Sequence, residues 1–311
     1  MHHSRNHSLV CLFALLSVVL SSARSAPAQP KEAPFRWINK LPAERTPLLL
    51  HGTFASAANK TDVGYYVYLP PGYEQAKSSD GAVKRFPVIY YLHGGRPGGE
   101  HKSISMAAVF DAAINAGRVP PLIYVFVNGG EMSHYDFPEK QSLGETAFVK
   151  ELIPHIDANY RTIAKREGRG IEGFSQGGRG TARIMFKYPE LFCSAAPMGG
   201  GHQHERHAAE NQGRETSGVQ FEPGNNTYDL AEAYAKRKDK FPLRILVGVG
   251  KQDFNYEANL DWMRHLAKLE IPYKQAIAGD APHSAAACYR NLGDQVMLFH
   301  SQSFATPVMT K

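Results

Sequence analysis

The stretch IEGFSQGGRG, residues 171–180, places one serine among four glycines. Its centre, residues 173–177, matches the pattern G-x-S-x-G, in which a serine occupies a strained turn between a buried strand and a helix. Such a turn is too tight for Cβ atoms on its flanks, which is why glycines are needed there. Because five residues can match by chance, the pattern predicts a nucleophile only if a strand precedes it, a helix follows it, and an acid and a histidine come later.

The segments around Ser175 alternate between short apolar runs and longer runs with helical spacing. Apolar runs that end at Gly or Pro are typical of strands buried on both faces of a parallel sheet, and the helices between them make the crossover connections. We therefore expect an α/β fold, a mostly parallel central sheet flanked by helices, with Ser175 between a strand and a helix. The expected strands are residues 63–69, 86–95, 122–130, 168–174, 191–201, 242–250 and 273–279, and the expected helices are residues 148–160, 179–188 and 259–269 and a closing helix after Gly293.

Two later loops supply the groups that a serine nucleophile needs. A serine hydroxyl reacts readily only when a neighbouring base takes its proton and an acid orients that base. Asp253 follows the run LRILVGVGKQ and His283 follows AIAGDAP, each just after an expected strand. The order Ser175, Asp253, His283 is that of the α/β-hydrolase fold. Glu257 and Asp261 are alternative acids within a helical pattern, and Asp253 has the alternative role of capping the following helix.

Catalysis of acyl transfer also needs two backbone N–H groups that stabilise the developing oxyanion. The first expected donor is Gln176, directly after the serine. The second is expected in the Gly-rich turn LHGGRPGG, residues 92–99, which follows a buried strand. We assign it to Gly95, with Gly94 and Arg96 as neighbouring alternatives. Turn chemistry alone would also explain these glycines.

The amino-terminal residues have the features of a secretory signal peptide. Basic and histidine residues precede the apolar run LVCLFALLSVVLSS, and Ala26-Pro27-Ala28 offers an A-x-A cleavage site, with Ser21-Ser22-Ala23 as a second choice. An uncleaved anchor is the alternative, but the run is short for a membrane span of about 20 residues. We expect a signal peptide over residues 1–28, a single α/β-hydrolase domain over residues 29–311, and a secreted or periplasmic protein without stable membrane association.

Composition excludes few other classes. The chain has 311 residues, 43% of them hydrophobic and 21% charged, which is ordinary for a globular protein. Its formal net charge of +6 is spread along the sequence without a basic stripe that carries aromatic residues, so we do not expect a nucleic-acid partner. Two cysteines, Cys193 and Cys288, remain after the signal peptide. An oxidising compartment permits a disulfide between them, but we favour two buried free thiols.

Two further segments are expected near the site. His202, His204 and His207 lie close together in the sequence, but a polar, Gly-led loop fixes no metal geometry, so we expect no metal and no cofactor. The surrounding residues 202–228 form a long stretch with little periodicity, which is typical of a surface loop or a cap over a cleft. Residues 128–136, NGGEMSHYD, follow another strand end and are also expected to face the cleft.

Five blocks together resemble the "putative esterase" family of α/β-hydrolases, over roughly residues 60–300. They are VYLPPGYE, FPVIYYLHGG, ELIPHIDANYRT, IEGFSQGGRG and APHS. The family includes feruloyl and acetylxylan esterases, esterase D-like enzymes, enterochelin esterases and mycolyltransferases. The resemblance implies a cofactor-free Ser–Asp–His carboxylesterase, often secreted and acting on carbohydrate-linked esters. Two departures weaken the transfer of a feruloyl substrate: Gln176 stands where many members have Met, and alanines rather than aromatic residues follow Ser284.

The expected function is therefore that of a secreted serine carboxylesterase. It would hydrolyse a small-molecule or carbohydrate-linked ester, such as an acetyl or hydroxycinnamoyl ester, through an acyl-enzyme intermediate. An acyltransferase would use the same three residues, with an acceptor alcohol in place of water. A non-catalytic binding module on the hydrolase fold is a third hypothesis, and the presence of all three residues argues against it. The sequence specifies neither the acyl and alcohol parts of the substrate nor the oligomeric state.

Overall fold

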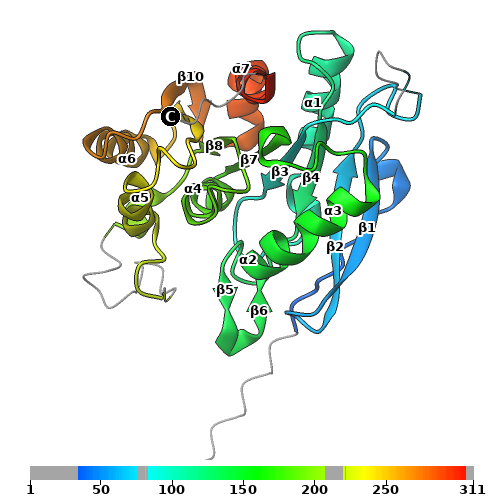
Figure 1. The fold of residues 1–311 in the computed structure, drawn as a ribbon, viewed down its shortest axis with the longest axis horizontal. Coiled ribbons are helices and arrows are strands. Elements are labelled where there is room, and N and C mark those ends of the chain that lie inside the picture. Colours follow the sequence, from blue (N-terminus) through cyan, green and yellow to red (C-terminus); the bar gives the residue numbers. More distant parts are fainter. Residues whose placement is uncertain (1–33, 76–80, 82, 207–219, 221, 306–311) are drawn as a thin grey trace, which may run out of the picture. The chain divides into compact units, whose positions relative to one another are not determined.

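Eight strands form the central sheet of the computed structural model, in the order β1-β2-β4-β3-β7-β8-β9-β10 (Figure 1). The structure describes residues 34–75, 81, 83–206, 220 and 222–305, so the predicted signal peptide lies outside the described residues. The strands from β4 to β10 in this order are parallel, whereas β1 and β2 join the edge in antiparallel fashion. The strand bounds are β1 (Leu49–Ser56), β2 (Thr61–Tyr68), β3 (Val88–Leu92), β4 (Ile123–Val127), β7 (Arg169–Phe174), β8 (Ser194–Met198), β9 (Arg244–Gln252) and β10 (Lys274–Pro282).

The strands have buried residues on both faces of the sheet. Val88, Tyr90 and Leu92 of β3 contribute to one apolar core, and the intervening Ile89 and Tyr91 contribute to the other. This explains the continuous apolar run in the sequence, because a strand covered on both sides needs no polar face. The predicted mostly parallel sheet flanked by helices is confirmed.

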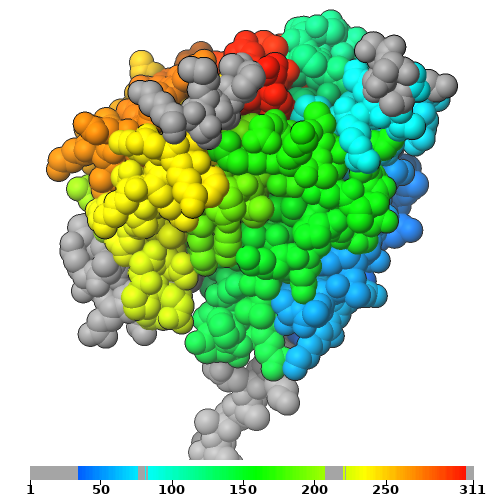
Figure 2. Space-filling model, in the orientation of Figure 1, coloured from blue at the N-terminus to red at the C-terminus, as the bar shows by residue number. Residues whose placement is uncertain are grey.

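Helices cover the two faces unequally (Figure 1). One core contains residues of α1 and α7, and the other contains residues of η4, α3, α4, α5 and α6. Figure 2 shows the blue β1–β2 region and the orange region of α6 and β10 at opposite sides of the view, as the strand order requires. The bounds are α1 (Met106–Asn115), the π-helical η4 (Ala147–Leu152), α3 (Ile153–Asn159), α4 (Gln176–Lys187), α5 (Thr227–Ala235), α6 (Tyr256–Lys268) and α7 (Ala285–Ala305).

Short elements complete the description. They are η1 (Ala43–Arg45), η2 (Glu100–Ser103), β5 (Asp136–Phe137), η3 (Pro138–Lys140), β6 (Ser142–Leu143), α2 (Gly144–Thr146), η5 (Arg166–Gly168) and η6 (His202–His204). β5 and β6 pair with each other as a separate two-stranded sheet. None of the helices in the described ranges combines the length and apolar character that a membrane crossing requires.

The closing helix differs from the prediction. It begins at Ala285, directly after the predicted histidine, and not after Gly293. Gly293 lies inside α7 and is buried, and a Cβ atom there would lie 3.3 Å from Val109 Cγ1 of α1. The glycine therefore permits close packing of two helices and does not mark a helix start. Strand β1 and helices α1 and α5 were not among the predicted elements.

Candidate active site

Three parallel strands deliver the three predicted residues to one edge of the sheet. Ser175 directly follows β7, Asp253 directly follows β9 and His283 directly follows β10. The carboxyl ends of parallel strands meet at the same edge, which is where open α/β sheets bind ligands. Residues far apart in the sequence thus come together because each one directly follows the carboxyl end of its strand.

The three side chains form a continuous hydrogen-bonded line. His283 Nε2 lies 2.9 Å from Ser175 Oγ, and His283 Nδ1 lies 2.8 Å from each carboxylate oxygen of Asp253. A carboxylate can only accept, so the Nδ1–H donates to Asp253 and Nε2 accepts from the serine hydroxyl. This tautomer leaves the imidazole ready to take the serine proton.

The turn at Ser175 has the strained geometry that the glycine pattern predicts. Ser175 has φ 60° and ψ −114°, an uncommon conformation for a residue with a side chain. Its N–H donates to Met198 O at 2.9 Å, which ties the turn to β8. A Cβ atom on Gly177 would lie 1.9 Å from Leu92 O, so the helix can approach β3 only with glycine at this position.

Among the candidate acids, only Asp253 contacts His283. Its side chain is fully buried, and its Oδ1 also accepts the backbone N–H of Asn255 at 2.7 Å. Of the alternatives, Asp261 pairs with Arg264 and Arg206 on the surface, and Glu257 is exposed on α6. Asn255 occupies the N-cap position of α6, and Asp253 lies two residues before it, so its carboxylate contacts both the N–H of the cap residue and His283.

The two segments expected to donate to an oxyanion both lie next to the serine. Gln176 is the first residue of α4, and the first N–H groups of a helix have no partner within it. In the loop after β3, a Cβ atom on Gly94 would lie 3.2 Å from Ser175 Cβ. Gly95 follows with φ +75°, which favours glycine. The geometry keeps Gly95 and its two neighbours as donor candidates in this loop.

Sequence reasoning did not assign roles to three residues that lie beside this site. Ser133 and His134 belong to the segment 128–136 and hydrogen-bond to the loop after β3. Phe254 is 77% exposed, and its ring centroid lies 4.1 Å from that of His283. The only available signal was position, since Phe254 is next to Asp253 and the segment 128–136 follows the end of β4.

The histidine-rich segment does not form a metal cluster in the part of the chain that the structure describes. His202 is buried, and its ring stacks on Trp262 at a centroid distance of 4.1 Å. Burial lowers the pKa of His202 to about 3. No group of three or more His, Cys, Asp or Glu residues suited to a metal ion occurs among the described residues. His207 and most of residues 207–221 lie outside them.

The two cysteines are free and buried. Burial raises the pKa of Cys193 to about 11 and that of Cys288 to about 12, which keeps both thiols protonated. The favoured prediction of two free thiols is therefore confirmed, and the disulfide alternative is wrong.

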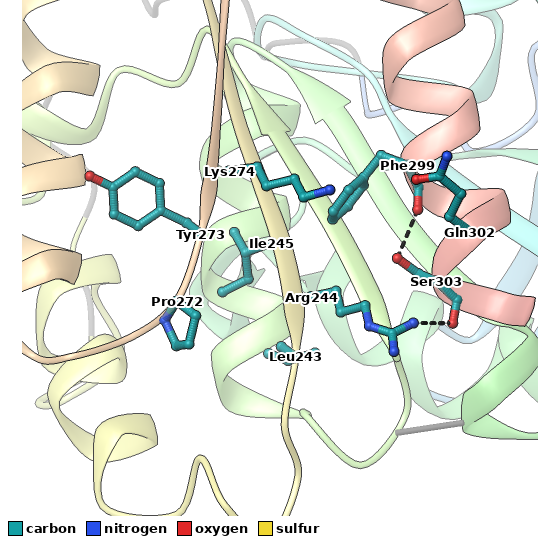
Figure 3. A pocket seen from close by; sticks show the side chains of 9 residues that line it. All are labelled: Leu243, Arg244, Ile245, Pro272, Tyr273, Lys274, Phe299, Gln302 and Ser303. Carbon is teal, nitrogen blue, oxygen red and sulfur yellow. Dashed lines mark hydrogen bonds between the residues drawn. The ribbon is translucent and has the colours of Figure 1, made fainter. Parts of the chain in front are cut away.

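Figure 3 shows a hollow of about 430 Å³ whose lining residues do not include Ser175. It is lined by the first residues of β9 and β10 and by the end of α7, where Arg244 donates to Ser303 O at 2.8 Å. The lining strand residues are at the amino-terminal ends of β9 and β10, whereas Asp253 and His283 follow the carboxyl ends of the same two strands. The hollow is therefore not the place where a group bound to Ser175 would sit.

Solved structures with this fold include several esterases. A ferulic acid esterase superposes with a TM-score of 0.66 at 21% identity, over 82% of this chain and 98% of that one. An S-formylglutathione hydrolase from Staphylococcus aureus gives a TM-score of 0.62 at 19% identity, over 81% and 98% of the two chains. At these identities the likeness shows the fold, which is the α/β-hydrolase fold.

Curated relatives match a part of the chain. An esterase of Mycobacterium tuberculosis is 32% identical over 161 residues, which are 50% of this chain and 33% of the relative. An endo-1,4-beta-xylanase/feruloyl esterase of Xylanibacter ruminicola is 32% identical over 147 residues, which are 43% of this chain and 19% of the relative. The chain thus spans a third or less of the length of these two relatives.

The family assignment rests on a longer match. The model of the family described as "Putative esterase" matches residues 56–275, which is more than half of the chain. The match includes Ser175 and Asp253 and ends shortly before His283. The chain belongs to the putative esterase family.

Proposed function

We propose that the protein is a secreted serine carboxylesterase in which Ser175 is the nucleophile, His283 the general base and acid, and Asp253 the orienting acid. The observation that carries the proposal is the hydrogen-bonded line from Ser175 Oγ through His283 to Asp253, with distances of 2.9 and 2.8 Å. Membership of an esterase family supports it. The reaction needs no cofactor.

In the first half-reaction, Ser175 Oγ attacks the ester carbonyl carbon while His283 Nε2 takes the hydroxyl proton. The carbonyl oxygen becomes an oxyanion, which the N–H groups of Gln176 and of Gly95 stabilise. When the tetrahedral intermediate collapses, the bond to the alcohol breaks and His283 returns the proton to the leaving alcohol. The buried carboxylate of Asp253 stabilises the imidazolium between these two transfers.

In the second half-reaction, water replaces the alcohol. His283 takes a proton from the water as its oxygen attacks the acyl-enzyme carbonyl, and the second tetrahedral intermediate releases the acid. The same histidine then restores the hydroxyl proton of Ser175. Release of free acid without an added acceptor alcohol separates this hydrolysis from acyl transfer.

The surroundings of His283 support an alcohol part larger than methanol. Because His283 protonates the leaving alcohol, this alcohol lies beside the imidazole. Phe254 is the exposed aromatic residue there, with its ring 4.1 Å from that of His283. An exposed aromatic face provides apolar contact area for a sugar or another ring. Together with the relative named endo-1,4-beta-xylanase/feruloyl esterase, this supports a carbohydrate-linked acetyl or hydroxycinnamoyl ester as substrate.

The proposed location rests on the signal-peptide features of residues 1–28, with residues 29–311 as one catalytic domain. Cleavage after Ala28 would leave Gln29 as the mature terminus, and the alternative site would leave Arg24. Sequencing the amino terminus of protein from the secreted or periplasmic fraction tests this. An intact Met1 in soluble cytosolic protein would contradict it.

The catalytic proposal is tested with p-nitrophenyl acyl esters and methyl hydroxycinnamates. We expect Ser175→Ala and His283→Ala each to abolish most turnover, and the double variant to be hardly worse than either single one. Residues that act as a unit are non-additive, because the base has no role without its nucleophile. A folded Ser175→Ala protein that hydrolyses these esters at the wild-type rate would end the serine-esterase proposal.

A further inference from the structure

The loop after β3 is held through its carbonyl groups by a second loop, residues 128–136. His134 Nε2 lies 3.0 Å from His93 O, and Ser133 Oγ donates to Gly95 O at 2.5 Å. Between them, the carbonyl of Gly94 accepts from His93 Nδ1 at 3.1 Å. Three consecutive peptide groups of this loop are thus fixed by side chains.

The two residues that reach across do so from an unfavourable backbone. Ser133 has φ +48° and His134 has φ +72°, a region that residues with side chains seldom adopt. Two such residues in succession persist only where surrounding contacts determine them, and such strain is concentrated at functional sites. Here the contacts are backbone bonds from His134 to Gly129 O at 2.7 Å and from Ser133 to Gly130 O at 3.2 Å.

Both side chains are buried, and each one is the donor in its hydrogen bond to the loop after β3. Ser133 is fully buried and His134 is 1% exposed. Burial, reinforced by the neighbouring His93, lowers the pKa of His134 well below its usual value, so the ring is neutral. A neutral imidazole has one N–H, and a carbonyl oxygen can only accept, so this hydrogen lies on Nε2. His134 therefore donates to His93 O.

We propose that Ser133 and His134 are positioning residues that aim the backbone N–H groups of the loop after β3 at the oxyanion. In a trans peptide the N–H points opposite to the C=O. Fixing the carbonyls of His93 and Gly95 therefore fixes the N–H groups of Gly94 and Arg96. The Gly95 N–H lies in the peptide between these two fixed groups. The carbonyl of that middle peptide accepts from His93 Nδ1, so Ser133 and His134 set the Gly94 and Arg96 N–H groups directly and the Gly95 N–H through its two neighbouring peptides.

This inference rests on the proposed esterase function, since an oxyanion forms only during acyl transfer. Its consequence is specific to the transition state, because preorganised donors bind the oxyanion more strongly than the substrate carbonyl. Loss of positioning should therefore lower kcat and leave KM nearly unchanged. A purely structural role would lower activity only in proportion to the loss of folded protein.

The first test compares two matched serine variants. Ser133→Ala removes a buried hydroxyl that donates to a backbone carbonyl, and so does Ser303→Ala, whose hydroxyl donates to Phe299 O at 2.7 Å in α7. We expect Ser133→Ala to lower kcat by about 10- to 100-fold, since a small misplacement near the reacting atoms costs up to about 10²-fold. KM should stay within about twofold, and Ser303→Ala should keep the wild-type kcat.

The second test is rescue at position 134. Gln can place an amide N–H near the position of the imidazole Nε2–H, whereas Leu has no donor. We expect His134→Leu to lose kcat as Ser133→Ala does, and His134→Gln to recover part of it. The affinity for phenylboronic acid, which forms a tetrahedral adduct with the serine, should fall in parallel with kcat/KM.

The outcomes distinguish the inference from the function on which it rests. If the wild-type protein hydrolyses esters but Ser133→Ala and folded His134→Leu keep kcat within about threefold, the positioning role is wrong and the esterase proposal stands. Activity losses that only follow a lower melting temperature would also overturn it. If the wild-type protein hydrolyses no ester and a fluorophosphonate does not label Ser175, both proposals fall.

Discussion

The contact between Gly177 and β3 leads to a quantitative prediction for Gly177→Ala. The new Cβ would lie 1.9 Å from Leu92 O and 2.6 Å from Leu92 C, which are backbone atoms. Strand β3 is held by β4 on one side and β7 on the other, so it cannot yield easily. To reach ordinary contact at 3.4 Å, the start of α4 must move away by about 1.5 Å.

This displacement carries the proposed oxyanion donor Gln176 with it, because Gln176 begins α4. A misplacement of about 1 Å near the reacting atoms can cost about 10² in rate, so we expect kcat to fall by about 10² or more. Forcing one extra methyl group into a packed contact costs about 1–3 kcal/mol of stability. The variant should therefore remain folded for a protein of ordinary stability.

The assay measures kcat and KM with p-nitrophenyl acetate and the free energy of unfolding in urea. Gly279→Ala is the matched control, because a Cβ at this exposed strand residue has nothing within 4 Å. It should keep wild-type kcat and stability. A folded Gly177→Ala protein with kcat within a few-fold of wild type would refute the reasoning, since α4 would then tolerate the shift without consequence for the site.

Three further predictions follow from individual contacts. Asp253→Asn should lower kcat by about 10²–10⁴ without unfolding, because the amide disturbs the tautomer of His283, and circular dichroism with steady-state kinetics checks this. Burial lowers the pKa of His93 to about 4 and that of His202 to about 3, below the usual 6.5. Each neutral ring therefore contributes stability that is present above pH 6.5 and is lost as the pH falls from 6.5 towards the pKa of that ring in the folded protein. Between pH 7.5 and pH 5, each of these two histidines should lower the free energy of unfolding by about 2 kcal/mol. Urea unfolding at both pH values checks this, and the His202→Phe variant should show a decrease that is smaller by about 2 kcal/mol than that of the wild type. The same decrease in the variant as in the wild type would contradict the assignment. Phe254→Ala should leave stability unchanged within about 0.5 kcal/mol, since the ring is exposed. It should lower kcat/KM about 10-fold for a sugar-linked ester but not for the methyl ester of the same acid, and equal effects on both would argue against contact with the alcohol.

Local sequence patterns were sufficient to predict much of the fold and to select the candidate site residues. The run at β3 is apolar throughout because both faces of the sheet are covered, and this pattern is visible without any structure. The glycines around Ser175 are equally visible, because a strained turn against β3 has no room for Cβ atoms. Edge strand β1 was not predicted because it is only partly buried and has no continuous apolar run. Gly293 misled the prediction of α7 because a glycine that permits helix packing looks the same in sequence as one that ends a helix.

The sequence by itself determined the order of the three residues and their position after strands, because both follow from local patterns along the chain. Only the tertiary structure decided that Asp253, and neither Glu257 nor Asp261, meets His283, because this depends on which side chains the packing of β9 and β10 brings within hydrogen-bonding distance. The same holds for Ser133 and His134. Their contacts with the loop after β3 join segments that are adjacent in space and about forty residues apart in the chain. No local periodicity records such a contact, because it arises from the pairing of neighbouring strands β3 and β4.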